Sequence, residues 1–97
     1  MLNKFTIAET ETFLKKIDNK KYNFLYPKIK NYIYPILQDN PFFGPNIKKL
    51  KGEFNDLYRF RIGRYRLFYE INKDEIIVFI ININCSCTKY SAQMLME

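Results

Sequence analysis

The apolar residues of the chain recur at one spacing in its first half and at another in its second half. In the first half they follow helical spacing, first at Phe13, Leu14 and Ile17 and then at Ile29, Ile33, Ile36 and Leu37. In the second half, short runs rich in Tyr, Phe, Ile and Val are typical of strands. We therefore expect the helices to precede most of the strands.

The first half predicts a short strand and two helices. Leu2–Ile7 alternates loosely, as a strand does, and a helix follows through Glu9–Ile17. Thr6 or Thr10 can cap this helix. A second helix covers Lys21–Gln38. Pro35 is expected to kink or fray this helix, because proline lacks a backbone N–H and clashes with the preceding turn.

The second half predicts a hairpin and a further strand, followed by a short helix. Gly63 and Arg64 form a candidate type II′ turn, which favours glycine at its first central position. The last strand is apolar at nearly every position, so we expect it inside the sheet with both faces covered. The predicted segments are a loop at Phe42–Gly52, strands at Leu57–Ile62, Arg64–Ile71 and Glu75–Ile83, and a helix at Thr88–Met96.

These elements predict one α+β domain over residues 1–97, in the order β-α-α-β-β-β. Two helices pack on one face of a mostly antiparallel four-stranded sheet, and the apolar stripes of both layers form the core.

Length and composition exclude several classes of protein. The chain has 97 residues, which is enough for one core, and 47% of them are hydrophobic, too many for a disordered tail. Its longest apolar run is far shorter than the roughly 20 residues of a membrane span. Because no secretory signal is visible at the start, we expect a cytoplasmic protein that does not bind membranes, with free thiols at Cys85 and Cys87.

The chain contains no histidine. This absence excludes a Ser-His-Asp triad and any zinc site built on imidazole. Cys85 and Cys87 alone are too few ligands for a metal. We therefore expect neither a metal nor a cofactor.

Positive charge is concentrated in one short stretch. The net charge is +6, and residues 48–66 hold seven basic and two acidic side chains, so this stretch carries +5 of the total. All four arginines of the chain lie between Arg59 and Arg66. Arginine matches phosphate oxygens with a planar fork of donors, so the stretch favours a polyanion as its partner, although a solvated face remains the alternative.

The predicted hairpin brings three arginines together. If Gly63 and Arg64 form the turn, Arg61 lies opposite Arg66, and Arg59 points to the same face. Like charges opposed on a sheet are destabilising, unless a bound anion reverses the sign of the interaction. Pairing with an acid is the alternative, since Glu70 lies diagonal to Arg59.

The stretch Lys48–Ile80 resembles the RelE/ParE toxin superfamily of bacterial toxin–antitoxin systems. The shared features are a Lys-Leu-x-Gly loop (Lys49–Gly52), a basic strand (Leu57–Ile62) and a Gly-x-Tyr-Arg-Leu-x-Tyr motif (Gly63–Tyr69), followed by an apolar strand. The resemblance implies that the chain is a toxin. For RelE-type members it implies an mRNA interferase, an endoribonuclease that cleaves mRNA on the ribosome by attack of a 2′-hydroxyl on the adjacent phosphate.

The resemblance also implies which residues act. By position, Arg59 and Arg61 match the two basic strand residues of RelE, Arg66 matches its arginine, and Tyr90 matches its C-terminal catalytic tyrosine. Arginine cannot act as a base at neutral pH, so proton transfer falls to Tyr90. The residues expected to bind RNA are Lys48, Lys49, Lys51, Arg64, Phe68 and Lys89.

One departure from the family leaves the target open. Many members carry His-Arg or Lys-Arg after the last strand, whereas this chain has Asn84–Lys89 there, with Lys89 as its one basic residue. Lys89 substitutes for the arginine, or catalysis is weakened, or the chain is a ParE-like toxin that inhibits DNA gyrase without nuclease activity. An inactive homologue that only binds an antitoxin is a further alternative. Every version implies a cognate antitoxin as partner.

Overall fold

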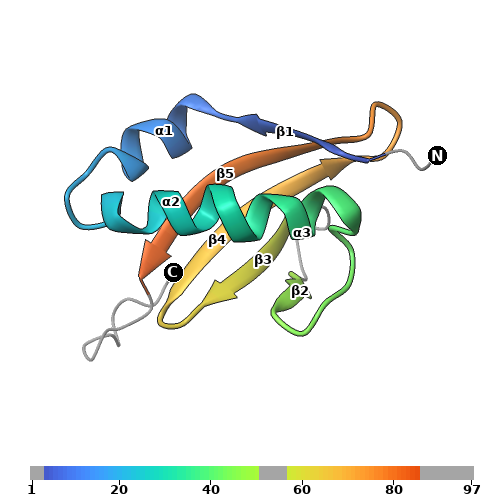
Figure 1. Ribbon diagram of the computed structural model, residues 1–97. Helices are drawn as coiled ribbons and strands as arrows, with labels where there is room; N and C mark the ends of the chain where they lie inside the picture. Colours follow the sequence, from blue (N-terminus) through green and yellow to red (C-terminus); the bar gives the residue numbers. More distant parts are fainter. Residues whose placement is uncertain (1–3, 51–56, 86–97) are drawn as a thin grey trace.

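The computed structural model describes residues 4–50 and 57–85. They form a five-stranded sheet in the order β1-β5-β4-β3-β2, with the helices on one face (Figure 1). β1 runs parallel to β5, and the other neighbours are antiparallel. The strands are β1 (Thr6–Glu9), β2 (Ile47–Lys49), β3 (Leu57–Ile62), β4 (Tyr65–Asn72) and β5 (Ile77–Cys85).

The predicted α+β class is confirmed, but the sheet has five strands and is mixed. The missed strand, β2, lies inside the segment that was predicted to be a loop. Its three residues pair with β3 through their backbones, and two of them are lysines, so the side-chain pattern gave no indication of a strand. Within the described residues, the first strand begins at Thr6, which is later than predicted. It pairs with β5, which is far away from it in the sequence.

The first helix is shorter than predicted and begins after a threonine cap. α1 covers Glu11–Ile17, and the Thr10 hydroxyl accepts a hydrogen bond from the backbone N–H of Phe13 at 3.3 Å. The same hydroxyl donates to the carbonyl of Ile80 at 2.7 Å. Thr10 therefore caps α1 and fixes its start against β5.

The second helix is not a regular α-helix, because its hydrogen-bonding pattern changes several times along its length. It comprises a 3-10 turn (Asn23–Leu25), α2 (Tyr26–Lys28), a π-helical turn (Ile29–Ile33) and α3 (Tyr34–Asp39). The N–H of Tyr34 donates to the carbonyl of Ile29, five residues earlier. The irregularity expected at Pro35 thus takes the form of a π-helical turn just before it, a common site of local distortion in helices.

The core lies between the helices and one face of the sheet. Buried residues alternate along β3 and β4, as half-buried strands require. β5 lies inside the sheet as predicted, but its burial also alternates, so the expectation that both of its faces are covered is wrong. Within the described segments, no helix is both long and apolar enough to cross a membrane. The predicted C-terminal helix, Thr88–Met96, lies outside the described residues.

Candidate functional site

The β3–β4 hairpin has the predicted register. Arg61 is the direct partner of Arg66, and Arg59 is the partner of Phe68. Gly63 has φ +60°, and Arg64 does not share a positive φ, as a type II′ turn requires. Because directly paired residues point to the same face, this register places the three arginines on one side of the hairpin.

That side is the face of the sheet opposite the helices. On β3, Tyr58 and Phe60 are buried in the core, whereas Arg59 between them is half-buried and Arg61 is exposed. On β4, Leu67 is fully buried, whereas Arg66 and Phe68 are half-buried. We call the outward surface formed by Lys48, Arg59, Arg61, Arg66 and Phe68 the arginine face.

Side chains of the arginine face line up in two rows across the strands. The pairings across β2, β3, β4 and β5 give the first row as Lys48, Arg59, Phe68 and Asn82. The second row is Arg61, Arg66 and Asn84. Each row therefore runs from cationic side chains to an amide on β5.

The cations of this face are not neutralised by the carboxylates around them. In the part of the chain that the structure describes, the ion pair found joins Lys4 to Asp39, at 3.3 Å, and neither residue lies on this face. The alternative pairing of Glu70 with Arg59 is therefore not formed. Burial, followed by the charges of Arg66 and Arg61, lowers the pKa of the Arg59 guanidinium. The three arginines are thus close enough to interact unfavourably, which is the condition that a bound anion would relieve.

The structure separates the other predicted binding residues. Lys48 shares the arginine face, because it is the partner of Arg59. Lys49 is the partner of Tyr58, with its Nζ 6.0 Å from the centre of that ring, so it points to the opposite side of the sheet. The two lysines therefore point to opposite sides of the sheet, since neighbouring residues of a strand alternate. Arg64 is exposed in the turn. Lys51, Lys89 and Tyr90 lie outside the described residues.

Three polar residues of this region were missed in the sequence. Asn82 and Asn84 end two cross-strand rows, and the Lys16 Nζ donates to Asn84 Oδ1 at 2.7 Å and to Asn82 Oδ1 at 3.4 Å. Burial, followed by the charge of Lys21, lowers the pKa of Lys16. Polar residues at every second position near the end of an apolar strand are the signal that could have revealed the asparagines. The contact with Lys16 depends on how α1 packs beside β5.

Cys85 ends β5 and is disulfide-bonded, so the expectation of free thiols is wrong at this residue. The prediction rested on the absence of a visible secretory signal, and β5 is described only as far as Cys85.

A comparison with protein families matches residues 11–87 to the ParE toxin of the type II toxin–antitoxin system parDE. No curated protein sequence gave a significant match. Among solved structures, the toxin–antitoxin complex RelBE2 of Mycobacterium tuberculosis matches with a TM-score of 0.71 and 21% identity, covering 88% of this chain and 94% of that chain.

Two further structures share the fold. A mutant of the Escherichia coli toxin RelE in complex with an antitoxin RelBc peptide gives a TM-score of 0.70 at 21% identity, with 96% of this chain and 95% of that chain covered. The archaeal RelE–RelB complex of Pyrococcus horikoshii gives 0.60 at 22% identity, with 86% and 96% covered. The family match extends over most of the chain. The chain therefore belongs to the RelE/ParE family of toxins of type II toxin–antitoxin systems.

Proposed function

We propose that this toxin is an endoribonuclease, an mRNA interferase that cleaves mRNA on the ribosome. The observation that carries the proposal is the pairing of Arg61 with Arg66, beside Arg59, on the sheet face opposite the helices, where no described carboxylate forms an ion pair with them. Such a cluster is costly in the free protein and favourable around a phosphate.

The reaction needs charge stabilisation and two proton transfers. The 2′-oxygen forms a bond to the adjacent phosphorus, the bond from phosphorus to the 5′-oxygen breaks, and the products are a 2′,3′-cyclic phosphate and a 5′-hydroxyl. The guanidinium groups of Arg59, Arg61 and Arg66 would stabilise the additional negative charge at phosphorus. Arginine stays protonated, so another group must take the proton of the 2′-hydroxyl. We assign that role to Tyr90 on the resemblance to RelE, and Tyr90 then returns the proton to the departing 5′-oxygen to give the 5′-hydroxyl.

The rest of the arginine face suits an RNA strand. Lys48 extends the cationic row toward the sheet edge, where it would attract phosphates without fixed geometry. Phe68 lies between Arg59 and Asn82 in the first row, where its ring is half-buried and faces outward. Aromatic rings in such positions stack on unpaired bases, which is a common mode of RNA recognition.

Primer extension on cellular mRNA after induced expression tests this function. The wild type and the control Lys20→Ala, which removes an exposed cation that is not part of the arginine face, should produce new mRNA 5′ ends. Arg66→Ala should reduce these ends at least tenfold, because it removes a charge from the phosphate site. Equal cleavage by Arg66→Ala and by the wild type would contradict the proposal.

A second candidate function is inhibition of DNA gyrase without nuclease activity. The match to the ParE toxin family and the absence of the His-Arg pair after β5 both favour it. A supercoiling assay with purified gyrase separates the two functions. Inhibited supercoiling with intact mRNA would select the gyrase inhibitor, and cleaved mRNA with normal supercoiling would select the interferase.

We also propose that a cognate antitoxin binds this toxin. The related structures from M. tuberculosis and P. horikoshii are complexes with antitoxins. An acidic segment would complement the arginine face and suppress its contact with RNA. Co-expression with the protein encoded next to the toxin gene should restore growth, and that protein should co-purify with the toxin.

A further inference from the structure

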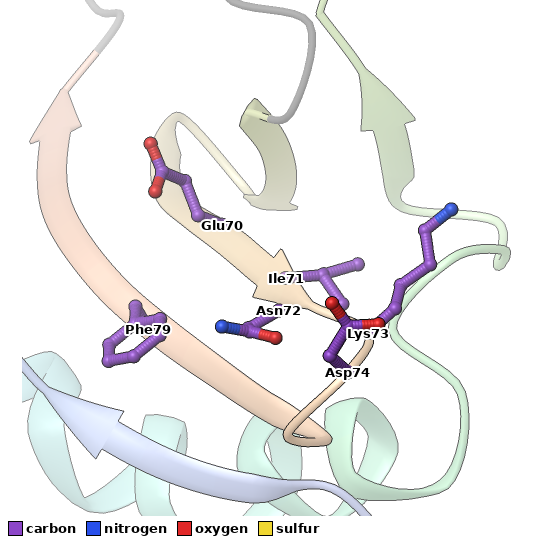
Figure 2. A pocket seen from close by; sticks show the side chains of 6 residues that line it. All are labelled: Glu70, Ile71, Asn72, Lys73, Asp74 and Phe79. Atoms are coloured by element: carbon purple, nitrogen blue, oxygen red, sulfur yellow. The ribbon is translucent and has the colours of Figure 1, made fainter.

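A third cross-strand row lies next to the two cationic rows and differs from them in chemistry. Leu57 is the partner of Glu70, and Glu70 is the partner of Phe79 on β5. All three point to the side of the sheet that carries the arginine face. Beside this row the surface is hollowed into a pocket of about 500 Å³, shown in Figure 2 and lined by Glu70, Ile71, Asn72, Lys73, Asp74 and Phe79.

The pocket combines a flat ring with an acceptor and a donor. Phe79 is half-buried in the middle of β5, and its cross-strand partner Glu70, which also lines the pocket, is exposed. Asn72 Oδ1 accepts a hydrogen bond from the backbone N–H of Glu75 at 3.0 Å. That bond fixes the carboxamide so that its nitrogen points to the side of Phe79 (Figure 2). A ligand over Phe79 therefore meets acceptor oxygens from Glu70 and N–H donors from Asn72.

The charge of Glu70 decides which part of a nucleotide fits here. Lys73 also lines the pocket, but within residues 4–50 and 57–85 no cation forms an ion pair with the Glu70 carboxylate, so both of its oxygens can accept from a ligand. A carboxylate repels phosphate but accepts hydrogen bonds from the N–H groups of a base. An RNA strand with its phosphates on the arginine face would consequently present a base, and not a phosphate, to this row.

The spacing of the rows is compatible with one nucleotide step. Successive outward positions on β4, from Arg66 to Phe68 and from Phe68 to Glu70, are two residues apart, which is about 7 Å along a strand. This distance is close to the length of one nucleotide in an extended single strand. A base next to the phosphate held by the arginines can therefore reach Phe79.

We propose that the pocket at Glu70, Asn72 and Phe79 is a base-specificity site that selects guanine in the bound RNA. Guanine is the base with two adjacent donors on one edge, N1–H and N2–H, which match the two oxygens of the Glu70 carboxylate. Its neighbouring O6 accepts from the Asn72 amide, while the ring stacks on Phe79. The proposal rests on the RNA-binding function proposed above and adds a sequence preference to it.

Direct binding of short RNAs tests the site without requiring cleavage. The probes are fluorescent hexamers of 2′-O-methyl uridine, which cannot be cleaved, and the same hexamers with one internal guanine, adenine or cytosine. By fluorescence anisotropy, the wild type should bind the guanine hexamer at least about tenfold more tightly than the all-uridine hexamer, the lower end of what a good bidentate base contact contributes.

Two variants separate the contributions of the pocket. Glu70→Gln should bring the four hexamers to within about twofold of one another, because an amide has one acceptor oxygen in place of two. The control Asp18→Asn, an equal change of charge at the exposed C-cap of α1, should keep the guanine preference. Phe79→Leu should weaken binding of every hexamer by about fivefold or more, because base stacking on an aromatic ring is lost.

The outcomes distinguish this site from the nuclease itself. Equal binding of all hexamers by the wild type, an unchanged guanine preference in Glu70→Gln, or no measurable RNA binding would each overturn the base-specificity site. If all hexamers bind equally but the wild type still produces new mRNA 5′ ends in cells and Arg66→Ala does not, the nuclease is upheld and the base-specificity site is rejected. The absence of mRNA cleavage would reject the nuclease, while a guanine preference that depends on Glu70 would uphold the pocket.

Discussion

Arg61 and Arg66 lie directly opposite each other in the β3–β4 hairpin, in the last pair before the residues that flank the turn. Arg59 lies two residues away on the same face, and the charges of both partners contribute to the lowered pKa of its guanidinium. The hairpin therefore carries three mutually repelling charges that the fold does not require, since the core residues of both strands point the other way.

Replacing one of these arginines should stabilise the free protein while it weakens RNA binding. We expect Arg61→Thr to raise the free energy of unfolding by about 0.5 kcal/mol, because it removes a directly opposed like charge and keeps a residue that favours strands. Urea denaturation at low salt measures the change, and the difference should shrink in high salt. A loss of stability in Arg61→Thr would show that the arginine supports the fold.

The salt dependence of RNA binding should count the cations that contact phosphates. For single-stranded RNA, a plot of log K against log salt concentration has a negative slope, and this slope becomes less steep by about 0.7 for each phosphate contact removed. Arg59→Ala and Lys48→Ala should each reduce the slope by about that amount, whereas Lys49→Ala should leave it unchanged, because Lys49 faces the other side of the sheet. Equal slopes for Lys48→Ala and Lys49→Ala would contradict the assignment of the face.

The hairpin was predictable from the sequence because two independent signals agree on it. More buried and less buried residues alternate along β3 and from Arg66 to Glu70 on β4, and Gly63 provides the positive φ of the turn. β2 was not predictable in the same way, because backbone pairing with β3 determines it. The parallel pairing of β1 with β5 could not be predicted from the local sequence either, since Thr6 and Ile77 are far apart in the chain.

The candidate site was predictable where it depends on strand alternation and not where it depends on packing. Arg59, Arg61 and Arg66 share a face because residues of equal parity do so, and the register confirms it. A cluster of charges in the sequence does not reveal which way each side chain points, so the orientation of Lys49 could not be predicted from it. Asn82 was missed because the pairing of β4 with β5 shifts its register between Phe68 and Tyr69, which changes the alternation along the apolar strand β5.

Gly63 holds the turn that keeps Arg61 and Arg66 opposed. A Cβ at this position would meet no atom within 4 Å, so the cost of replacing the glycine comes from its φ of +60° alone. Gly63→Ala should therefore destabilise the fold by about 1 kcal/mol, the usual cost of a left-handed backbone for a residue with a side chain. Thermal or urea unfolding measures it. A neutral Gly63→Ala would contradict the turn geometry.

Stability should fall steeply in alkaline solution because several tyrosines are held protonated. Glu9 Oε2 accepts hydrogen bonds from the hydroxyls of Tyr26 at 2.7 Å and Tyr34 at 2.8 Å. Burial and then Glu9 raise the pKa of Tyr26 to about 12 and raise that of Tyr34 further. Burial, followed by the neighbouring Tyr58, also raises the pKa of Tyr69, whose hydroxyl donates to the Pro41 carbonyl at 2.7 Å.

These raised pKa values set the sign of the pH dependence. Below about pH 10 the tyrosines are protonated in both the folded and the unfolded chain, so their contribution to stability is complete. Above that pH the unfolded chain loses protons that the folded chain keeps, and the free energy of unfolding falls by about 1.4 kcal/mol per pH unit for each such tyrosine. Urea unfolding of Tyr34→Phe should show a slope shallower by that amount. An identical slope would contradict the raised pKa of Tyr34.

Cleavage of ribosome-bound mRNA by the purified toxin is the most direct test of the arginine face as a nuclease site. The wild type and Lys20→Ala should cleave at equal rates, whereas Arg61→Ala and Arg66→Ala should each be at least about tenfold slower while remaining folded. Full activity in a folded Arg61→Ala, Arg66→Ala double variant would contradict the proposed role of the opposed arginines.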